Sequence, residues 1–524
     1  MSTIGAYFRL TRVGWVLVRE GVISTLPSEG LPPMIAFAKS AAGIFARKRA
    51  MRQERSDRLS KAVARLGPSY VKIGQFLATR PDVVGAELAD DLAGLQDRMA
   101  FFPTDEAKSS VRESLGRPVG ELYAAFDEPI AAASIAQVHP GEVDTGEGRR
   151  KVAIKVIRPG VRRRFSADLE AMYLVSRLQE RFLPHMRRLK PVEVTRTLEQ
   201  TTKIEMDLRL EAAALSEIAD NTKDDPGFRV PKVDWARTGR DVVTMEWIDG
   251  IKMSDVEALK AAGYDLNALA DTLIQSFLRH TLRDGFFHAD MHPGNLFVDP
   301  QGMIVAVDMG IVGRLGKKER RFLAEILYGF ITRDYLRVAE VHFEAGYVPG
   351  HHNVASFAQA IRAIGEPIHG QPAETISMGK LLTLLFEVTE LFDMATRPEL
   401  VMLQKTMVVV EGVARMLNPQ FNMWKASEPV VSGWIRDNLG PMRIATDLKD
   451  GLKAAFRLAE VAPEIAAKTE KFHGELMHMS EHGLRFDAET ADAIGKSEAH
   501  HSRFGRLALW VIAIALVYIA VNIG

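Results

Sequence analysis

A lysine in the middle of an apolar strand most limits how this chain can fold. Residues 151–157 read Lys-Val-Ala-Ile-Lys-Val-Ile, a run that predicts a strand, and Pro159-Gly160 end it. The charge of Lys155 cannot stay buried there without a partner. Either Lys155 lies at a sheet edge with its ammonium in water, or distant parts of the chain supply acidic partners.

A turn of very small residues precedes this strand. The backbone of such a turn can approach phosphate groups closely. Its spacing to Lys155 suits a hairpin that covers a nucleotide, as the glycine-rich loop does in kinases. The residues that we expect to line a nucleotide here are Ala131, Ala132, Ala133, Ser134, Ile135, Ala136, Gln137 and Val138, together with Lys155.

Two further segments place acidic and amide side chains after this strand. In the loop 288–295, His-Ala-Asp-Met-His-Pro-Gly-Asn, Asp290 and Asn295 stand as in the kinase catalytic loop H-R-D-x-x-x-x-N. Asp308, followed by Met309-Gly310, ends the apolar strand 304–307 and is placed like the kinase D-F-G metal ligand. Carboxylate and amide oxygens suit Mg²⁺. Each segment alone is weak evidence, but their order predicts an Mg²⁺–ATP site.

The histidines of the same loop permit another interpretation. His288 and His292 flank Asp290 and could belong to a transition-metal site, although no third ligand is suggested nearby. The chain has no cysteine, which excludes disulfides, Cys-ligated zinc and thiol catalysis. It has 67 basic and 67 acidic residues, which excludes a globally basic nucleic-acid binder. We therefore expect no nucleic-acid partner.

Lys155 also needs a glutamate from a helix, and residues 205–211 offer three acids. In one continuous helix Asp207 and Glu211, four residues apart, would share a face, whereas Glu205 and Glu211 would not. Such a charged run is otherwise typical of a solvated helix face. An apolar strand that ends at Glu246 leads into Trp247-Ile248, a hinge whose backbone we expect to hold an adenine ring through Glu246 and Ile248.

Both ends of the chain carry apolar segments. Residues 7–22 predict an amphipathic helix, which either lies on a membrane surface or packs against its own protein. Residues 507–524 contain no charge, and a helix of that length reaches ~27 Å, close to the ~30 Å bilayer core. Arg503 and Arg506 precede it, which predicts a tail anchor with the body in the cytoplasm. The alternative is an apolar helix buried in the protein.

One further motif points to a family. Residues 66–75 read Leu-Gly-Pro-Ser-Tyr-Val-Lys-Ile-Gly-Gln, with no counterpart in ordinary kinases, and Thr79-Arg80-Pro81-Asp82 and Leu95-Gln96-Asp97 follow. With the alanine-rich turn, the catalytic loop and Asp308-Met309-Gly310, the chain from about 65 to 419 resembles the UbiB/ADCK family of atypical, protein-kinase-like ATPases linked to ubiquinone biosynthesis.

The resemblance implies roles for particular residues. Lys72, Gly74 and Gln75 match the family's K-x-G-Q motif, and Glu205 and Asp207 match its E-x-D motif. The family places Lys72 near these two acids over the active site, which implies a regulatory cover against peptide substrates. The resemblance also makes Glu211 the helix partner of Lys155. It implies catalytic roles for Asp290, Lys155 and Glu211, metal ligation by Asn295 and Asp308, and the cofactors ATP and Mg²⁺.

Two departures from ordinary kinases argue against a protein substrate. Ala289 stands where the catalytic-loop arginine would be, and the next helix begins near Lys317 without an Ala-Pro-Glu motif. A peptide-docking segment has little room between Asp308 and that helix. The alternatives that remain are a protein kinase acting on other biosynthetic enzymes, or an ATP-switched lipid-presenting scaffold without catalysis. No G-x-G-x-x-G turn or facial-triad pattern supports a hydroxylase.

The expected fold class is α+β, a bilobal kinase-like fold with a helical N-terminal extension, a mostly helical C-lobe and a C-terminal transmembrane helix. The expected domains are the extension 1–117, the N-lobe with a helical insertion 118–250, the C-lobe 251–480, a polar linker 481–506 and the anchor 507–524. The resemblance implies a bacterial inner-membrane ATPase or small-molecule kinase that supports ubiquinone biosynthesis, including ring hydroxylation. Expected partners are membrane lipid, polyprenylated ubiquinone precursors and other enzymes of that biosynthesis.

Overall fold

The computed structural model describes residues 3–23, 55–78, 88, 91–92, 99–146, 148–182, 190–370, 388, 391–394 and 398–439. Chain contacts divide the protein into two units, Met1–Arg436 and Asp437–Gly524, and the elements that form the site belong to the first. In the described residues, no helix combines the length and apolarity needed to cross a bilayer. The predicted linker 481–506 and anchor 507–524 lie outside the described residues.

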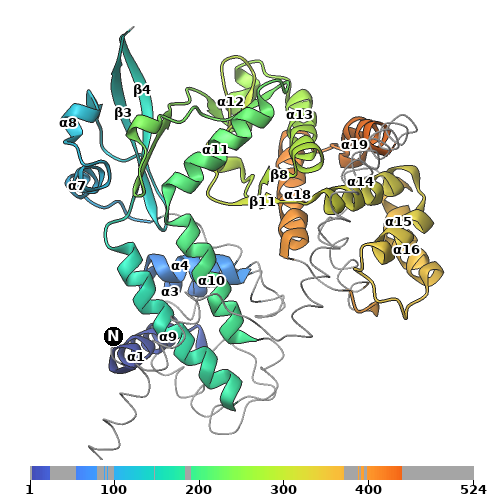
Figure 1. Ribbon diagram of the computed structural model, residues 1–524, viewed down its shortest axis with the longest axis horizontal. Helices are drawn as coiled ribbons and strands as arrows, with labels where there is room; N and C mark the ends of the chain where they lie inside the picture. Colours follow the sequence, from blue (N-terminus) through green and yellow to red (C-terminus); the bar gives the residue numbers. More distant parts are fainter. Residues whose placement is uncertain are drawn as a thin grey trace, which may run out of the picture. The chain divides into compact units, whose positions relative to one another are not determined.

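An antiparallel sheet carries Lys155. Its central hairpin joins β3 (Ala136–Thr145) to β4 (Gly148–Ile157) (Figure 1). Strands β1 (Ala125–Phe126) and β2 (Ala131–Ala132) pair with β3, and β6 (Val242–Glu246) pairs with β4. The predicted strand 151–157 is confirmed as the second half of β4. Alternate residues Val152, Ile154 and Val156 are fully buried on one face, where α7 (Thr104–Leu115) and α8 (Val119–Leu122) pack. Lys155, out of phase with them, faces the other side.

The helices after this sheet supply its acidic partner. They are α9 (Val161–Phe182), α10 (Pro191–Glu205) and α11 (Leu208–Thr222), and α9 packs against the N-terminal helices α1 (Thr3–Arg19) and α4 (Pro68–Ala78). Helix α3 (Arg55–Leu66) leads to α4 through Gly67, whose φ of 107° suits glycine. Residues 205–211 do not form one continuous helix: α10 ends at Glu205, and Asp207 caps α11 by accepting from the N–H of Arg209.

A second sheet carries the catalytic-loop segment. Its order is β5 (Phe228–Arg229), β10 (Ile304–Ala306), β9 (Leu296–Val298) and β7 (Ile251–Lys252), and β8 (Phe286–His288) pairs separately with β11 (Val312–Arg314). The predicted strand at 304–307 is confirmed. Strand β5 runs parallel to β10. Only an isolated bridge joins Val233 to Met245.

Helices make up the rest of the described chain. Helices α12 (Val256–Ala261) and α13 (Leu266–Arg279) precede a π-helical turn, His280–Asp284. After β11 come α14 (Lys317–Thr332), α15 (Tyr335–Glu344), α16 (Val354–Gly370), α18 (Pro398–Leu417) and α19 (Met423–Leu439). Helix α14 begins at the predicted Lys317. Helix α18 packs along α13, so it belongs to the same core as the second sheet.

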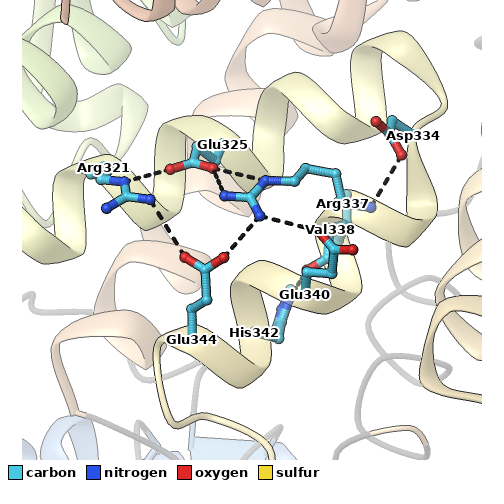
Figure 2. Close-up of polar contacts among 8 residues, drawn as sticks. All are labelled: Arg321, Glu325, Asp334, Arg337, Val338, Glu340, His342 and Glu344. Atoms are coloured by element: carbon cyan, nitrogen blue, oxygen red, sulfur yellow. Dashed lines mark hydrogen bonds and ion pairs between the residues drawn. The ribbon is translucent and has the colours of Figure 1, made fainter. Parts of the chain in front are cut away.

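A charged network joins α14 to α15 (Figure 2). The buried carboxylate of Glu325 accepts from Arg321 at 2.6 Å and from Arg337 at 3.1 Å. Glu344 binds the same two guanidinium groups, at 3.4 Å and 2.8 Å. Each carboxylate therefore bridges two arginines, which compensates the cost of burying Glu325.

Candidate active site

The strand lysine meets two carboxylates from distant segments. Nζ of Lys155 donates to Glu211 at 2.7 Å and to Asp308 at 3.1 Å. Glu211 lies in the first turn of α11, and Asp308 follows β10. The Lys155 side chain is 12% exposed and Glu211 6%, whereas Asp308 keeps 40% of its side chain accessible. The edge-strand interpretation of Lys155 is therefore wrong, and Asp308 has room for another ligand.

The charges of this trio are strongly coupled. Burial would lower the pKa of Lys155, but Asp308 and Glu211 hold that pKa above its ordinary value. Burial raises the pKa of Glu211 to about 7 against the lowering effect of Lys155. Burial would also raise the pKa of Asp308, but Lys155 and the N–H of Gly310 hold it well below its usual range. Asp308 is therefore ionised at neutral pH, as a metal ligand must be.

The loop after β8 holds Asp290 against Asn295. Nδ2 of Asn295 donates to the backbone carbonyl of Asp290 at 3.3 Å and lies 3.4 Å from its carboxylate. The N–H of Asp290 donates to Nδ1 of His288, which is buried, and burial lowers the pKa of that imidazole. A short 3₁₀ turn, Pro293–Asn295, reverses the chain and directs it into β9. The fold thus sets the spacing of the two side chains.

Strand pairing brings Asn295 and Asp308 to the same end of the second sheet. The N–H of Val307 donates to the carbonyl of Asn295 at 3.0 Å, and Asp308 is the next residue. One oxygen of Asp308 accepts from Gly310 at 2.8 Å, which orients the carboxylate. An amide oxygen and a partly accessible carboxylate on adjacent strand ends form a donor set that suits Mg²⁺.

The alanine-rich turn forms part of the first sheet. Ala131 and Ala132 pair with Val138 and Gln137 across a tight turn closed by the N–H of Ala133 on the carbonyl of Ala136. The side chain of Gln137 is committed elsewhere, because its amide exchanges two hydrogen bonds with the backbone of Phe102. Only the backbone of this turn remains suited to phosphate. Ser134 is buried, and Ile135 is half-buried.

The expected hinge continues from β6. Glu246 is the last residue of β6 and pairs with Val152 of β4, so the hinge lies beside the strand that carries Lys155. Its carboxylate is not free for a ligand, since Arg229 binds both oxygens at 3.0 and 3.2 Å. Ile248 is half-buried. Any adenine contact from Glu246 would therefore come from its backbone.

Helix α4 places Lys72 against the end of α10. The ammonium of Lys72 forms an ion pair with Glu205, and both side chains are largely buried, at 13% and 6% exposed. Asp207 instead binds the Arg209 guanidinium at 2.6 and 2.9 Å. Gly74 is buried, and the half-buried side chain of Gln75 makes no hydrogen bond to any residue that the structure describes. Of the two acids expected near Lys72, the structure thus pairs it with Glu205.

The transition-metal interpretation of the catalytic loop is not supported. Among the described residues, one group of three or more potential metal ligands converges, and it consists of His351, His352 and Asp393. It lies in loops outside the site, where Asp393 and His351 are both about two-thirds exposed. His288 and His292 instead use their imidazoles within the loop, since each accepts a backbone N–H two residues later.

Two site-adjacent residues carried no signal in the sequence. Thr406 of α18 donates a hydrogen bond to the carbonyl of Ala289, 117 positions earlier, at 2.9 Å. Burial lowers the pKa of its neighbour Lys405, and the charge of Asp290 opposes that shift. Helix α18 has ordinary helical periodicity, so spacing alone could not have linked it to the catalytic loop.

These features together define a class of protein. A strand lysine held by a helix glutamate, an aspartate after a short strand and an Asp–Asn loop form a kinase-like arrangement. Between Gly310 and α14, however, the chain forms only the three-residue strand β11, Val312–Arg314, so the peptide-docking segment of ordinary kinases is absent here. The fold and the site are those of an atypical kinase-like protein.

Comparison with known proteins identifies the family. Residues 94–342 match the ABC1 atypical kinase-like domain, and residues 361–422 match the UbiB helical domain. Proteins named "Probable protein kinase UbiB" are similar over most of the chain. The one from Marinobacter nauticus is 39% identical, covering 87% of this chain and 84% of its own. The one from Cronobacter sakazakii is 43% identical, covering 79% and 76%. The chain belongs to the UbiB family.

A solved structure is also similar. It is described as "The complex structure of Rv3197-erythromycin from Mycobacterium tuberculosis". The identity is 22%, the TM-score is 0.48, and the match covers 75% of this chain and 98% of that one.

Proposed function

We propose that this protein binds Mg²⁺–ATP and transfers the terminal phosphoryl group to water or to a small molecule, in support of ubiquinone biosynthesis. The observation that carries the proposal is the position of Lys155, which lies between Glu211 and Asp308 at 2.7 and 3.1 Å. Glu211 would orient the ammonium toward the α- and β-phosphates. The partly exposed carboxylate of Asp308 and the side-chain amide oxygen of Asn295 would both bind the metal ion.

The remaining residues fit a site whose catalysis is positioning and charge neutralisation. Bound Mg²⁺ would supply charge neutralisation at the β- and γ-phosphates. Asp290, held by Asn295, would position the attacking water or hydroxyl. The backbone of Ala131–Val138 would cover the phosphates, and the backbone of the 246–248 hinge would hold the base.

The acceptor is proposed to be water or a small molecule, with a protein acceptor disfavoured. The short path from Gly310 through β11 to α14 leaves no peptide-docking segment in this described stretch. The buried pair of Lys72 and Glu205 fixes α4 to α10, which supports a covering role for the K-x-G-Q helix. Pathway support by lipid presentation alone remains the competing proposal, and it requires binding without turnover.

Membrane attachment is part of the proposal. The uncharged residues 507–524 would anchor the chain in the bacterial inner membrane with its body on the cytoplasmic side. The proposed partners are membrane lipid, polyprenylated precursors and other enzymes of ubiquinone biosynthesis, including those of ring hydroxylation. Release of the chain from washed membranes by high salt would contradict the anchor.

The decisive experiment follows the fate of the γ-phosphate. Purified full-length chain in detergent receives γ-labelled ATP with Mg²⁺ or with a chelator, each with and without vesicles containing a polyprenyl-phenol. We expect Mg²⁺-dependent release of labelled phosphate, or a labelled small molecule, stimulated by the vesicles. Label found only in protein would favour the protein-kinase alternative. ATP binding without any turnover would favour the scaffold.

A further inference from the structure

Two histidines and an aspartate converge outside the proposed ATP site. His351 and His352 lie in the connection between α15 and α16, and Asp393 lies 41 positions after His352, in the segment 391–394. Nε2 of His352 lies 3.1 Å from Oδ2 of Asp393, and Nε2 of His351 lies 3.7 Å from the same oxygen. The potential ligand atoms of all three residues lie within 4.8 Å of one another. A single ion can therefore contact all three side chains.

A hydrogen bond accounts for only one of these two contacts. Nε2 of His352 is within hydrogen-bond distance of the carboxylate, whereas 3.7 Å is too long for a hydrogen bond from His351. The two imidazole rings also lie against each other, with centroids 4.1 Å apart. Protonation of both rings would place two positive charges together. Neutral imidazoles that share one bound cation avoid this repulsion and use both nitrogens.

The spacing of the ligand atoms suits a tetrahedral transition-metal ion. Zn²⁺ binds imidazole nitrogen and carboxylate oxygen at about 2.1 Å, which in a tetrahedral site places neighbouring ligand atoms about 3.4 Å apart. The two nitrogen–oxygen distances, 3.1 and 3.7 Å, lie on either side of that value. Two imidazoles with one carboxylate favour zinc-class ions over Mg²⁺, which prefers oxygen ligands.

The core of the protein holds the backbone on both sides of this cluster. Phe392 precedes Asp393 and is 7% exposed. The centroid of its ring lies 5.0 Å from that of Phe357 on α16 and 5.3 Å from that of His352. Asp393 has a left-handed backbone, with φ 49°, which aspartate tolerates better than most residues. The ligands are therefore positioned before an ion binds, which lowers the cost of binding.

We propose that His351, His352 and Asp393 form a Zn²⁺ site, which ties the α15–α16 connection to the segment 391–394. The side chains of His351 and Asp393 are 67% and 68% exposed, so the ion can enter from solvent and keep a water molecule as its fourth ligand. The cluster shares no residue with the proposed Mg²⁺–ATP site. The inference therefore stands or falls independently of the proposed function.

The test measures zinc binding in the absence of nucleotide. Full-length chain without a polyhistidine tag is stripped with chelator, and Zn²⁺ is titrated calorimetrically in excess Mg²⁺. His351→Gln and Asp393→Asn each change one ligand at an exposed position, and asparagine also tolerates the left-handed backbone. The matched control is Asp220→Asn, which changes an exposed aspartate of α11. Asp308→Asn tests whether the ion binds at the proposed ATP site instead.

We expect His351→Gln and Asp393→Asn each to weaken Zn²⁺ binding by about 100-fold, because loss of even an outer-shell partner costs roughly 10–100-fold in affinity. Asp220→Asn and Asp308→Asn should bind Zn²⁺ like the unaltered chain. Zn²⁺ should raise the thermal midpoint of the unaltered chain but not that of the two ligand variants. Without metal all midpoints should agree closely, since these substitutions lie at the surface.

Three results would overturn the inference. Unchanged Zn²⁺ affinity in both His351→Gln and Asp393→Asn would place the ion elsewhere on the chain. Loss of binding in Asp308→Asn, with the ligand variants unaffected, would assign the ion to the proposed ATP site. If the unaltered chain bound no Zn²⁺, the cluster would be a hydrogen-bonded pair of Asp393 and His352 beside an exposed histidine.

Discussion

The ammonium of Lys155 lies 3.1 Å from Oδ2 of Asp308, so the lysine proposed for phosphate and the carboxylate proposed for metal contact each other directly. Glu211 also accepts a hydrogen bond from this ammonium, at 2.7 Å. In Asp308→Asn the negative charge is lost and the side chain keeps its size. We expect Mg²⁺-dependent phosphate release to fall by about 100-fold or more.

The matched control is Asp271→Asn, which changes an exposed aspartate of α13 and should leave turnover unchanged. ATP affinity in the presence of chelator should stay within about threefold of the unaltered chain, since Lys155 keeps Glu211. Full Mg²⁺-dependent turnover in Asp308→Asn would refute the metal role of this carboxylate.

The buried pair of Lys72 and Glu205 predicts a charge-swap result. Lys72→Glu places two carboxylates together in a largely buried position, and we expect it to cost about 3 kcal/mol of unfolding free energy. The double variant Lys72→Glu/Glu205→Lys restores opposite charges and should recover more than half of that loss. Chemical denaturation measures the energies, and hydrogen exchange over 68–78 reports the docking of α4. Additive losses in the double variant would show that the two side chains do not interact.

The network of Figure 2 predicts unequal effects from two glutamates. Glu325→Ala leaves Arg321 and Arg337 without their shared, buried acceptor, and should lower the unfolding free energy by about 2 kcal/mol. Glu340→Ala removes a contact to Arg337 at 3.1 Å from a side chain that is 46% exposed, and should cost less than about 0.5 kcal/mol. Equal midpoints in urea for the two variants would contradict the bridging role of Glu325.

A buried histidine predicts loss of stability in mild acid. Burial lowers the pKa of His280 to about 3, although Asp225 at 3.7 Å opposes the shift. Arg283 and Arg279 also disfavour the charged ring. As the pH falls through about 6.5, His280 is protonated in the unfolded chain but stays neutral in the folded chain. The free energy of unfolding therefore falls with the pH. From pH 7.5 to 5.5 this costs about 1.4 kcal/mol.

The comparison variant for this effect is His280→Gln, which cannot titrate. Other buried histidines also contribute to the acid sensitivity of the chain, so the quantity to measure is the difference between the two proteins. The stability of the unaltered chain should fall by about 1.4 kcal/mol more than that of His280→Gln over this pH range. If the stability of the two proteins depended on pH in the same way, the pKa of His280 would not differ between the folded and unfolded states.

The parts of the fold that could be predicted are those governed by local rules. The strand around Lys155 has β-branched alternation, Gly67-Pro68 breaks a helix, and α14 begins at Lys317 as expected. The need of Lys155 for a carboxylate could be predicted from its place in an apolar strand, whereas the choice of Glu211 among three acids came from the family resemblance. Each of these inferences needs only a few neighbouring residues or a single charge balance.

The parts that could not be predicted depend on tertiary contacts. Asp207 stands in a charged run that is compatible with one helix, and only the packing of α10 and α11 makes it a cap bound to Arg209. Strand β5 pairs in parallel with β10 across 76 positions of sequence, from Phe228 to Ile304, which no local pattern encodes. The contact of Thr406 with Ala289 could not be predicted for the same reason, since nothing in the sequence around this helical threonine indicates a distant partner.

The bond from Thr406 to Ala289 also sets an order of events during synthesis. All of the recognisable motifs, from Lys72 to Asp308, leave the ribosome before α18, because Thr406 follows its partner by 117 residues. At a translation rate of roughly 10 residues per second, Thr406 is synthesised roughly ten seconds after Ala289. A nascent or prematurely terminated chain therefore carries the complete set of motifs while the contact from α18 to Ala289 is still missing.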